Sequence, residues 1–357
     1  MRLLPSVTPP LRYFLPPIGG SILQASSSLI LVSGRRYRLN HVTANMETQN
    51  KLMNEAKKHV DSRLCRVSGS MTEIMEIQAE NPTFYVLFIP GNPGVVSFYK
   101  EFLESLYEFL DGNASVIAIG QISHTSKDWE SGRLFSFQEQ IDHKIDFIRQ
   151  ELESVKVPII LVGHSIGSYI SLEILRKYSE KVVYCIGLYP FLTLNQQSTK
   201  QSLIGKLAAS SVLSATASFL IASLRLLPMS AARLLVSNSI GASWSDTAVQ
   251  ATCTHLRQYH TMRNVLFMAK SEFRELAAEP DWDFMRENQS KLAFLFGIDD
   301  HWGPLQLFEE ISKQAPGASL AIEREGHTHG FCCTMAGSAW AAQHVATLIK
   351  NRFSQIQ

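Results

Sequence analysis

Apolar segments of strand length alternate with segments of helical periodicity along most of the chain, and this alternation limits the fold more than any other feature. The early apolar segments are Thr83–Pro90, Ser115–Ile119, Val157–Gly163 and Lys181–Tyr189. Nearly continuous apolar runs of this length are typical of strands buried on both faces. Helix-length stretches separate them, as in residues 97–110, whose apolar side chains fall on one helical face. The alternation therefore predicts a parallel sheet covered by helices.

A β-hairpin is predicted over Ser62–Ala79, before the first of these strands. The strand and helix alternation stops at Pro190 and resumes with a strand at Lys291–Gly297. A helix, a short strand at Ala318–Glu323 and a closing helix of about 337–353 follow. We therefore expect one α/β domain over residues 62–357, with residues 191–289 inserted as a helical cap or lipid-contact element.

The composition suits a well-cored globular protein, with 45% hydrophobic and 18% charged residues. The formal net charge is +1 and the lysines and arginines are scattered, so no nucleic-acid partner is expected. The five cysteines show no CxxC pair and no Cys/His cluster of zinc-ligand spacing, which indicates reduced thiols in a cytosol-facing protein. They are Cys65, Cys185, Cys253, Cys332 and Cys333.

Residues 1–46 differ from the rest of the chain. They contain five arginines, five prolines and several serines, and the first carboxylate is Glu47. This composition resembles an organelle transit peptide, which would direct import. A disordered leader, or an upstream extension ahead of a start at Met46, accounts for it equally well. Either way, residues 1–46 are treated as a leader outside the fold.

The motif GHSIG, at 163–167, lies directly after one predicted strand and directly before one predicted helix. This is the context in which GxSxG forms the nucleophile elbow of an α/β-hydrolase. The serine of such an elbow occupies a tight, strained turn, and the flanking Gly163 and Gly167 remove side chains that would collide there. Ser165 is therefore the candidate nucleophile, and His164 is interpreted as a packing residue.

Acyl transfer places negative charge on a carbonyl oxygen, which fixed backbone N–H groups stabilise. In this fold one donor is the residue after the nucleophile, here Ile166. The second comes from the loop after the third strand, where PGNPG (90–94) stands, so the amide of Asn92 is the candidate. A plain Pro/Gly turn without a catalytic task is the alternative for this loop.

The fold orders its triad as serine, acid and histidine. Asp299 and Asp300 follow the strand at 291–297, where a triad acid belongs, and Asp300 is preferred. The segment GHTHGF (326–331) follows the last strand and offers His327 and His329 as the base. Two further histidines, His124 and His301, are candidates for the pocket wall.

These residues together resemble the lipid droplet-associated hydrolase family, a branch of the α/β-hydrolases. The resemblance spans about Thr83 to Lys350, and it is to a plant-like member with an N-terminal extension that family members mostly lack. The matching segments are PGNPG with Phe98-Tyr99, Ser123-His124, QIDHK (140–144), GHSIGSY (163–169), DxWGP (300–304) and HGF (329–331).

The resemblance implies Ser165 as nucleophile, Asp300 as acid and His329 as base, and it suggests lipid esters as substrates. The expected protein is thus a carboxylic ester hydrolase of the lipase or esterase type, acting at a lipid droplet or endoplasmic reticulum surface without a metal or cofactor. Two alternatives stay open: an acyltransferase with the same triad, and a lipid-droplet or membrane scaffold with little catalysis.

Within the insertion, Leu207–Leu224 runs 18 residues without a charge, between Lys206 and Arg225. That length is at the lower edge for a spanning helix, and its serines and alanines argue against spanning. An interfacial helix, a hairpin entering an oil phase and a lid over the active site all remain open. A lipid droplet or membrane surface is accordingly an expected partner, through residues 203–228.

Overall fold

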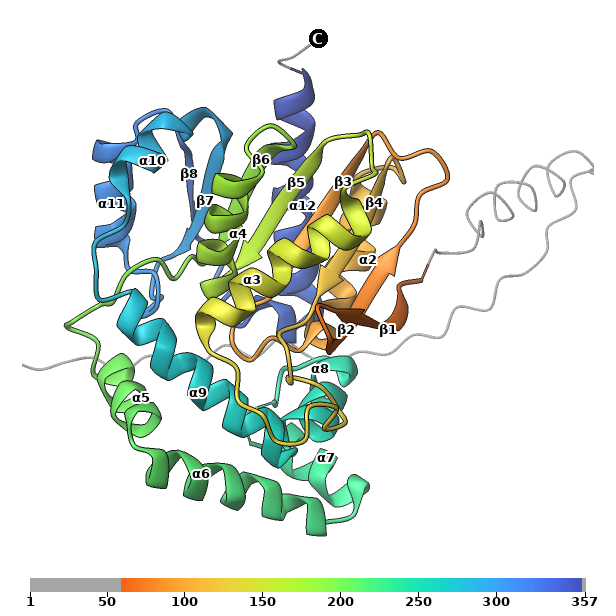
Figure 1. The fold of residues 1–357 in the computed structure, drawn as a ribbon, viewed down its shortest axis with the longest axis vertical. Helices are drawn as coiled ribbons and strands as arrows, with labels where there is room; N and C mark the ends of the chain where they lie inside the picture. The colour runs from red at the N-terminus through yellow and green to blue at the C-terminus, as the bar shows by residue number, and fades with distance from the viewer. Residues whose placement is uncertain (1–58, 240, 355–357) are drawn as a thin grey trace, which may run out of the picture. The chain divides into compact units, whose positions relative to one another are not determined.

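The computed structural model describes residues 59–239 and 241–354, so the predicted leader at 1–46 lies outside the described residues. The described residues form an eight-stranded sheet in the order β1-β2-β4-β3-β5-β6-β7-β8 (Figure 1). The strands are β1 (Asp61–Val67), β2 (Ser70–Ile77), β3 (Phe84–Ile89), β4 (Ala114–Ile119), β5 (Ile159–His164), β6 (Val182–Leu188), β7 (Leu292–Gly297) and β8 (Ser319–Glu323). β1 and β2 form the predicted hairpin and join the sheet antiparallel, while β4 to β8 run parallel with β3 among them. The predicted helix-covered, mostly parallel sheet is confirmed.

Helices cover both faces of the sheet, and the strand residues alternate between two hydrophobic clusters. α3 (Phe137–Phe147), α4 (Ile166–Lys177) and α11 (Leu305–Gln314) pack on one face, while α2 (Lys100–Phe109) and α12 (Met335–Ser354) pack on the other. In β3, Leu87 and Ile89 join the first cluster, and Val86 and Phe88 join the second. Burial on both sides explains why these strands are continuous apolar runs instead of alternating ones.

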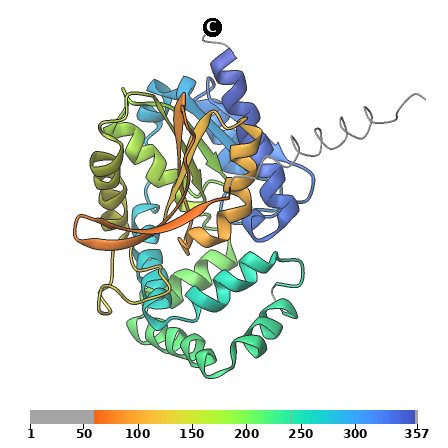
Figure 2. The same ribbon diagram turned by 90° about the vertical axis from the view of Figure 1, so that its right-hand side faces the viewer.

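The segment between β6 and β7 is helical, and most of it lies beyond one end of the sheet (Figures 1 and 2). Its helices are α5 (Thr199–Ala209), α6 (Ser211–Ser223), α7 (Met229–Ser237), α8 (Asp246–Ala251), α9 (Tyr259–Glu275) and α10 (Trp282–Glu287). α9 packs against α5 and α6 on one side and against α3 on the other, so it connects these two cap helices to the sheet domain.

The uncharged segment 207–224 is divided between two helices. Ser210 separates α5 from α6, and its hydroxyl caps α6 by accepting a hydrogen bond from the Leu213 amide. Among the described residues, no single helix is long and apolar enough to cross a membrane. Taken together, α5 and the stretch 211–226 are long and apolar enough, but the two helices are bent by 98° relative to one another.

α6 buries polar side chains and exposes apolar ones. Its small polar residues Ser214 and Ser218 are buried, and Arg263 of α9 donates a hydrogen bond of 2.8 Å to the Ser214 hydroxyl. Its large apolar residues point outward instead, with Val212 75% and Phe219 66% exposed. A helix packed on a protein normally buries its apolar stripe, so this one leaves an apolar face uncovered.

Candidate active site

Ser165 occupies the turn between β5 and α4, as the GHSIG motif predicts. Its backbone has φ 55° and ψ −123°, a conformation that a non-glycine residue rarely adopts. The Ser165 amide donates a hydrogen bond of 2.9 Å to the carbonyl of Leu188 in β6, which holds the turn in place. Ser165 is 8% exposed, and what exposure remains faces a cavity.

The two motif glycines are required by close backbone contacts. A Cβ on Gly163 would lie 2.3 Å from the carbonyl oxygen of Gly167. A Cβ on Gly167 would lie 2.2 Å from the carbonyl oxygen of Ile89, at the end of β3. Because neither backbone group can be displaced cheaply, only glycine allows α4 to begin this close to the sheet.

The structure brings Asp300 and His329 together. Nδ1 of His329 lies 2.8 Å from Oδ2 of Asp300, and Oδ1 of Asp300 accepts a hydrogen bond of 2.9 Å from the Trp302 amide. The Asp300 side chain is 1% exposed. Its neighbour Asp299 is exposed, and His327 packs against the Trp340 ring at a centroid distance of 5.4 Å.

His329 lines the same cavity as Ser165. In the part of the chain that the structure describes, no hydrogen bond joins the Ser165 hydroxyl to His329. Hydrogen bonds of this kind are often long in free enzymes and shorten when substrate binds. With Nδ1 facing the Asp300 carboxylate, Nε2 of His329 is the ring nitrogen left for a proton transfer.

The PGNPG loop follows β3 and lies against the elbow. A Cβ on Gly91 would be 3.1 Å from Cβ of Ser165, so this loop borders the elbow serine. The Gly91 amide already donates to the Tyr99 hydroxyl, at 3.3 Å. Within the described residues, the amides of Asn92 and Ile166 have no such partner, so both N–H groups are free to bind an oxyanion.

His164 makes specific hydrogen bonds, which the interpretation as a packing residue missed. Its Nδ1 lies 2.7 Å from the Tyr99 hydroxyl, and its Nε2 lies 2.9 Å from the carbonyl oxygen of His329. A carbonyl only accepts, so Nε2 carries the proton and Nδ1 accepts from Tyr99. Burial, together with the nearby His329, holds the pKa of His164 well below its usual value, which keeps the ring neutral. A chain of hydrogen bonds thus runs from the Gly91 amide through Tyr99 and His164 to the His329 backbone.

The prediction that His124 and His301 line the pocket is wrong, since neither residue borders this cavity. His124 instead accepts a hydrogen bond of 2.8 Å from the Gly94 amide, at the far end of the PGNPG loop. Burial lowers the pKa of His124 to about 3, so the ring stays neutral and able to accept. The position of His124 in a loop after a strand predicted that it lies near the site. Only the structure shows that His124 contacts the Gly94 end of the PGNPG loop instead of the cavity.

The cavity at Ser165 has a volume of about 430 Å³ and a mostly apolar wall. The cap supplies much of that wall, including Ile204 and Leu207 of α5 and Val265, Leu266 and Phe273 of α9. A volume of this size is within the range of small-molecule sites. Within the described residues, no group of three or more His, Cys, Asp or Glu side chains could hold a metal ion.

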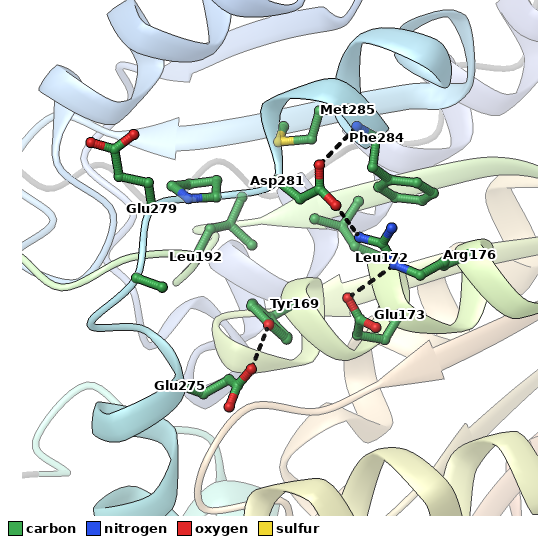
Figure 3. Close-up of a pocket in the computed structure, with 12 residues that line it drawn as sticks. Tyr169, Leu172, Glu173, Arg176, Leu192, Glu275, Glu279, Asp281, Phe284 and Met285 are labelled. Carbon is green, nitrogen blue, oxygen red and sulfur yellow. Dashed lines mark hydrogen bonds and ion pairs between the residues drawn. The ribbon is translucent and has the colours of Figure 1, made fainter.

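A second cavity of about 360 Å³ lies between α4 and the segment that joins α9 to α10 (Figure 3). Its polar wall is largely paired within itself: Arg176 lies 3.0 Å from Asp281 and 3.6 Å from Glu173. Tyr169 donates to Glu275 at 3.4 Å, which ties α4 to the end of α9. These pairs anchor the return of the cap to the sheet domain, and none of the predicted site residues lines this cavity.

The fold and the elbow define an α/β-hydrolase, and solved structures agree with that class. An epoxide hydrolase from Vigna radiata is similar, with a TM-score of 0.58 and 14% identity, over 83% of this chain and all (100%) of that chain. An esterase from Thermogutta terrifontis is similar with a TM-score of 0.53 and 13% identity, over 82% and 99% of the two chains. At these identities the likeness shows the fold alone.

The sequence relatives are more specific. A family model described as lipid-droplet associated hydrolase matches residues 82–332, and the chain belongs to that family. The lipid droplet-associated hydrolase of Rattus norvegicus is 28% identical over 305 residues, which cover 80% of this chain and 90% of that protein. The protein of the same name from Gallus gallus is 26% identical over 277 residues, covering 74% and 84%. The resemblance inferred from the motifs is therefore confirmed.

Proposed function

We propose that the protein is a serine ester hydrolase whose nucleophile is Ser165, with His329 as its base and Asp300 as the orienting acid. The amides of Ile166 and Asn92 form the oxyanion hole. The observation that carries this proposal is the placement of an elbow serine and a His–Asp pair around one apolar cavity. All the groups stand at the carboxyl ends of parallel strands, which meet at one edge of the sheet.

The reaction proceeds in two halves. Oγ of Ser165 attacks the ester carbonyl carbon while Nε2 of His329 takes its proton, and the oxyanion forms against the two amides. The C–O bond to the alcohol breaks as His329 returns the proton to the leaving oxygen, which leaves an acyl-enzyme. Water, deprotonated by His329, then attacks the acyl carbon. The bond between this carbon and Oγ of Ser165 breaks as His329 returns the proton to Oγ, which releases the fatty acid and restores Ser165. Asp300 stays ionised and holds the imidazole in the required tautomer.

The apolar wall of the cavity supports an ester with a hydrocarbon acyl chain as substrate. The relatives are named lipid droplet-associated hydrolases, which supports lipid esters as the class and a lipid droplet as the place of action. A cytosol-facing position on a droplet or on the endoplasmic reticulum fits the five cysteines, none of which is disulfide-bonded.

The first test is labelling of the purified chain by a fluorophosphonate probe in the presence of emulsified lipid. Wild type is expected to label, and Ser165→Ala and His329→Ala are expected to lose labelling. His327→Ala is the matched control, because its ring packs on Trp340 outside the cavity, and it should label like wild type. A folded wild type that does not label would favour the scaffold alternative.

The same residues would also transfer the acyl group to an alcohol other than water. Product analysis with a long-chain alcohol added to the emulsion separates the two reactions. Free fatty acid as the main product supports hydrolysis, whereas a new ester formed at the expense of fatty acid supports the acyltransferase.

The uncovered apolar face of α6 supports binding to a lipid surface, which we propose as a second function of residues 203–228. Val212, Leu213, Phe219 and Leu220 are each more than half exposed, and Leu226 beyond the helix is 89% exposed. A patch of this kind is unfavourable in water and favourable at an acyl interface. The bend between α5 and α6 and the position of α6 at the outer edge of the cap suit an interfacial helix better than a lid.

Flotation with lipid droplets reconstituted from phospholipid and triacylglycerol tests this. Phe219→Ser with Leu220→Ser removes two side chains from the patch and is expected to weaken binding by at least about tenfold. Leu64→Ser, at an exposed apolar residue of edge strand β1, is the control and should float like wild type. Equal flotation of the α6 variant and wild type would refute the assignment.

A further inference from the structure

Glu272 is a carboxyl group buried in the wall of the cavity that contains Ser165. It lies on α9, its exposure is 3%, and the proposed reaction gives it no role. A carboxyl in an apolar wall is unfavourable unless it is paired with a cation or protonated. The cavity lining contains no lysine or arginine among the described residues, so a cation does not compensate it there.

The hydrogen bonds of Asn92 determine which oxygen of Glu272 is engaged. Nδ2 of Asn92 donates to the Val265 carbonyl at 3.0 Å and to Oε1 of Glu272 at 2.9 Å. Because a backbone carbonyl only accepts, the Asn92 amide cannot be turned to place its oxygen there. Oε1 of Glu272 therefore accepts, and any proton on this carboxyl resides on Oε2.

The carboxyl is protonated at neutral pH. Burial raises the pKa of Glu272 to about 8, although the hydrogen bond from Asn92 acts in the opposite direction. α5 contributes only the apolar Ile204 and Leu207 to this wall. The other titratable groups that line the cavity are Tyr99, His164, His329, Cys332 and Cys333.

Oε2 thus carries an O–H group, and the hydrogen bond described for Glu272 uses Oε1 alone. Oδ1 of Asn92, on the residue that Glu272 contacts, is buried and also has no hydrogen-bond partner among the described residues. The carboxyl also borders the cavity, so a molecule bound there can offer an acceptor oxygen to this donor. An apolar ligand group would leave the hydroxyl unpaired, whereas an oxygen atom of the ligand would satisfy it.

We propose that Glu272 is a specificity residue, which donates a hydrogen bond to a second oxygen of the substrate and selects lipid esters with a carbonyl or hydroxyl oxygen near the scissile ester. Acylglycerols have such an oxygen on the neighbouring carbon of the alcohol half, and esters of simple alkanols do not. The inference rests on the proposed function, because it assumes that Ser165 attacks an ester in this cavity.

The test compares kcat/KM for a monoacylglycerol and for an alkyl ester of the same fatty acid at pH 7, with the full chain in the same emulsion. Wild type is expected to prefer the acylglycerol, and Glu272→Leu to reduce that preference by about tenfold. Glu272→Gln should retain it, because the amide keeps an acceptor for Asn92 and an N–H donor for the substrate. Glu275→Leu is the matched control, since Glu275 lies one turn further along α9 and lines the other cavity.

A pH series supplies a second measurement that does not depend on the folding of Glu272→Leu. Between pH 7 and pH 9 the wild-type preference should fall as Oε2 loses its proton, and that of Glu272→Gln should not. A preference that persists in Glu272→Leu, or that changes equally with pH in wild type and Glu272→Gln, would overturn the proposal. Fluorophosphonate labelling separates the two failures: labelling with no effect at Glu272 refutes only the specificity role, and a wild type that neither labels nor hydrolyses refutes the function as well.

Discussion

Replacing Asp300 by asparagine should abolish most activity while leaving the fold intact. The Trp302 amide must keep an acceptor, so the amide oxygen of the new side chain takes the place of Oδ1 and its NH₂ group faces Nδ1 of His329. Nδ1 then has to accept, which moves the imidazole proton to Nε2. A ring protonated at Nε2 cannot take the proton of Ser165. Because the Asp300 side chain is 1% exposed, water does not substitute for it.

The expected loss in kcat is about 10³- to 10⁴-fold, or roughly 4–5.5 kcal/mol of transition-state stabilisation, with KM little changed. Steady-state hydrolysis of an emulsified ester measures it, and thermal unfolding reports that the variant is folded. Asp299→Asn is the matched control, because Asp299 is exposed on the adjacent position, and it should retain nearly full activity. Asp300→Asn with more than a tenth of wild-type kcat, or equal losses in both variants, would refute the assignment of the acid.

Contacts around the site lead to three further predictions. Gly163→Ala places a methyl group 2.3 Å from the Gly167 carbonyl, so we expect a loss of about 2–4 kcal/mol in the free energy of unfolding, measured by urea titration; an unchanged midpoint would contradict it. Tyr99→Phe removes the hydroxyl that accepts from the Gly91 amide, and kcat should fall roughly tenfold at nearly constant KM, whereas a change in KM alone would argue for a role in substrate binding. Burial raises the pKa of Glu272 from 4.5 to about 8, so the folded chain retains a proton that the unfolded chain releases, and stability should decline as pH rises through this window. In Glu272→Gln that decline should be smaller by up to about 4–5 kcal/mol, and equal slopes in the two proteins would refute the burial of an ionisable group there.

Much of the fold could be predicted because it depends on short-range patterns. A strand buried on both faces, such as Ile159–His164, has to be apolar throughout, and this is visible in a single sequence. The glycines of the elbow are similarly local, since they respond to backbone contacts that any GxSxG turn makes. The order serine, acid, histidine follows from the topology of the sheet once the strands are assigned.

Adjacent candidates were harder to separate from the sequence. Asp299 and Asp300 stand next to one another after β7, and His327 and His329 share one loop. Loop residues follow no fixed period, so the pattern does not say which side chain faces the serine. In the structure Asp300 is buried against His329 while Asp299 faces solvent, a difference that depends on where β8 and its loop pack.

The sheet, the elbow and the strand ends at which the site forms all follow from the order of residues along the chain. Which apolar and charged residues of the cap are buried and which are exposed depends instead on contacts between distant segments. The apolar side chains of α6 point outward because its serines meet α9, and Glu272 reaches Asn92 across 180 residues of chain. A helical period shows which residues share a face, but the partner of that face is fixed by tertiary packing, and this packing also sets the burial that keeps Glu272 protonated.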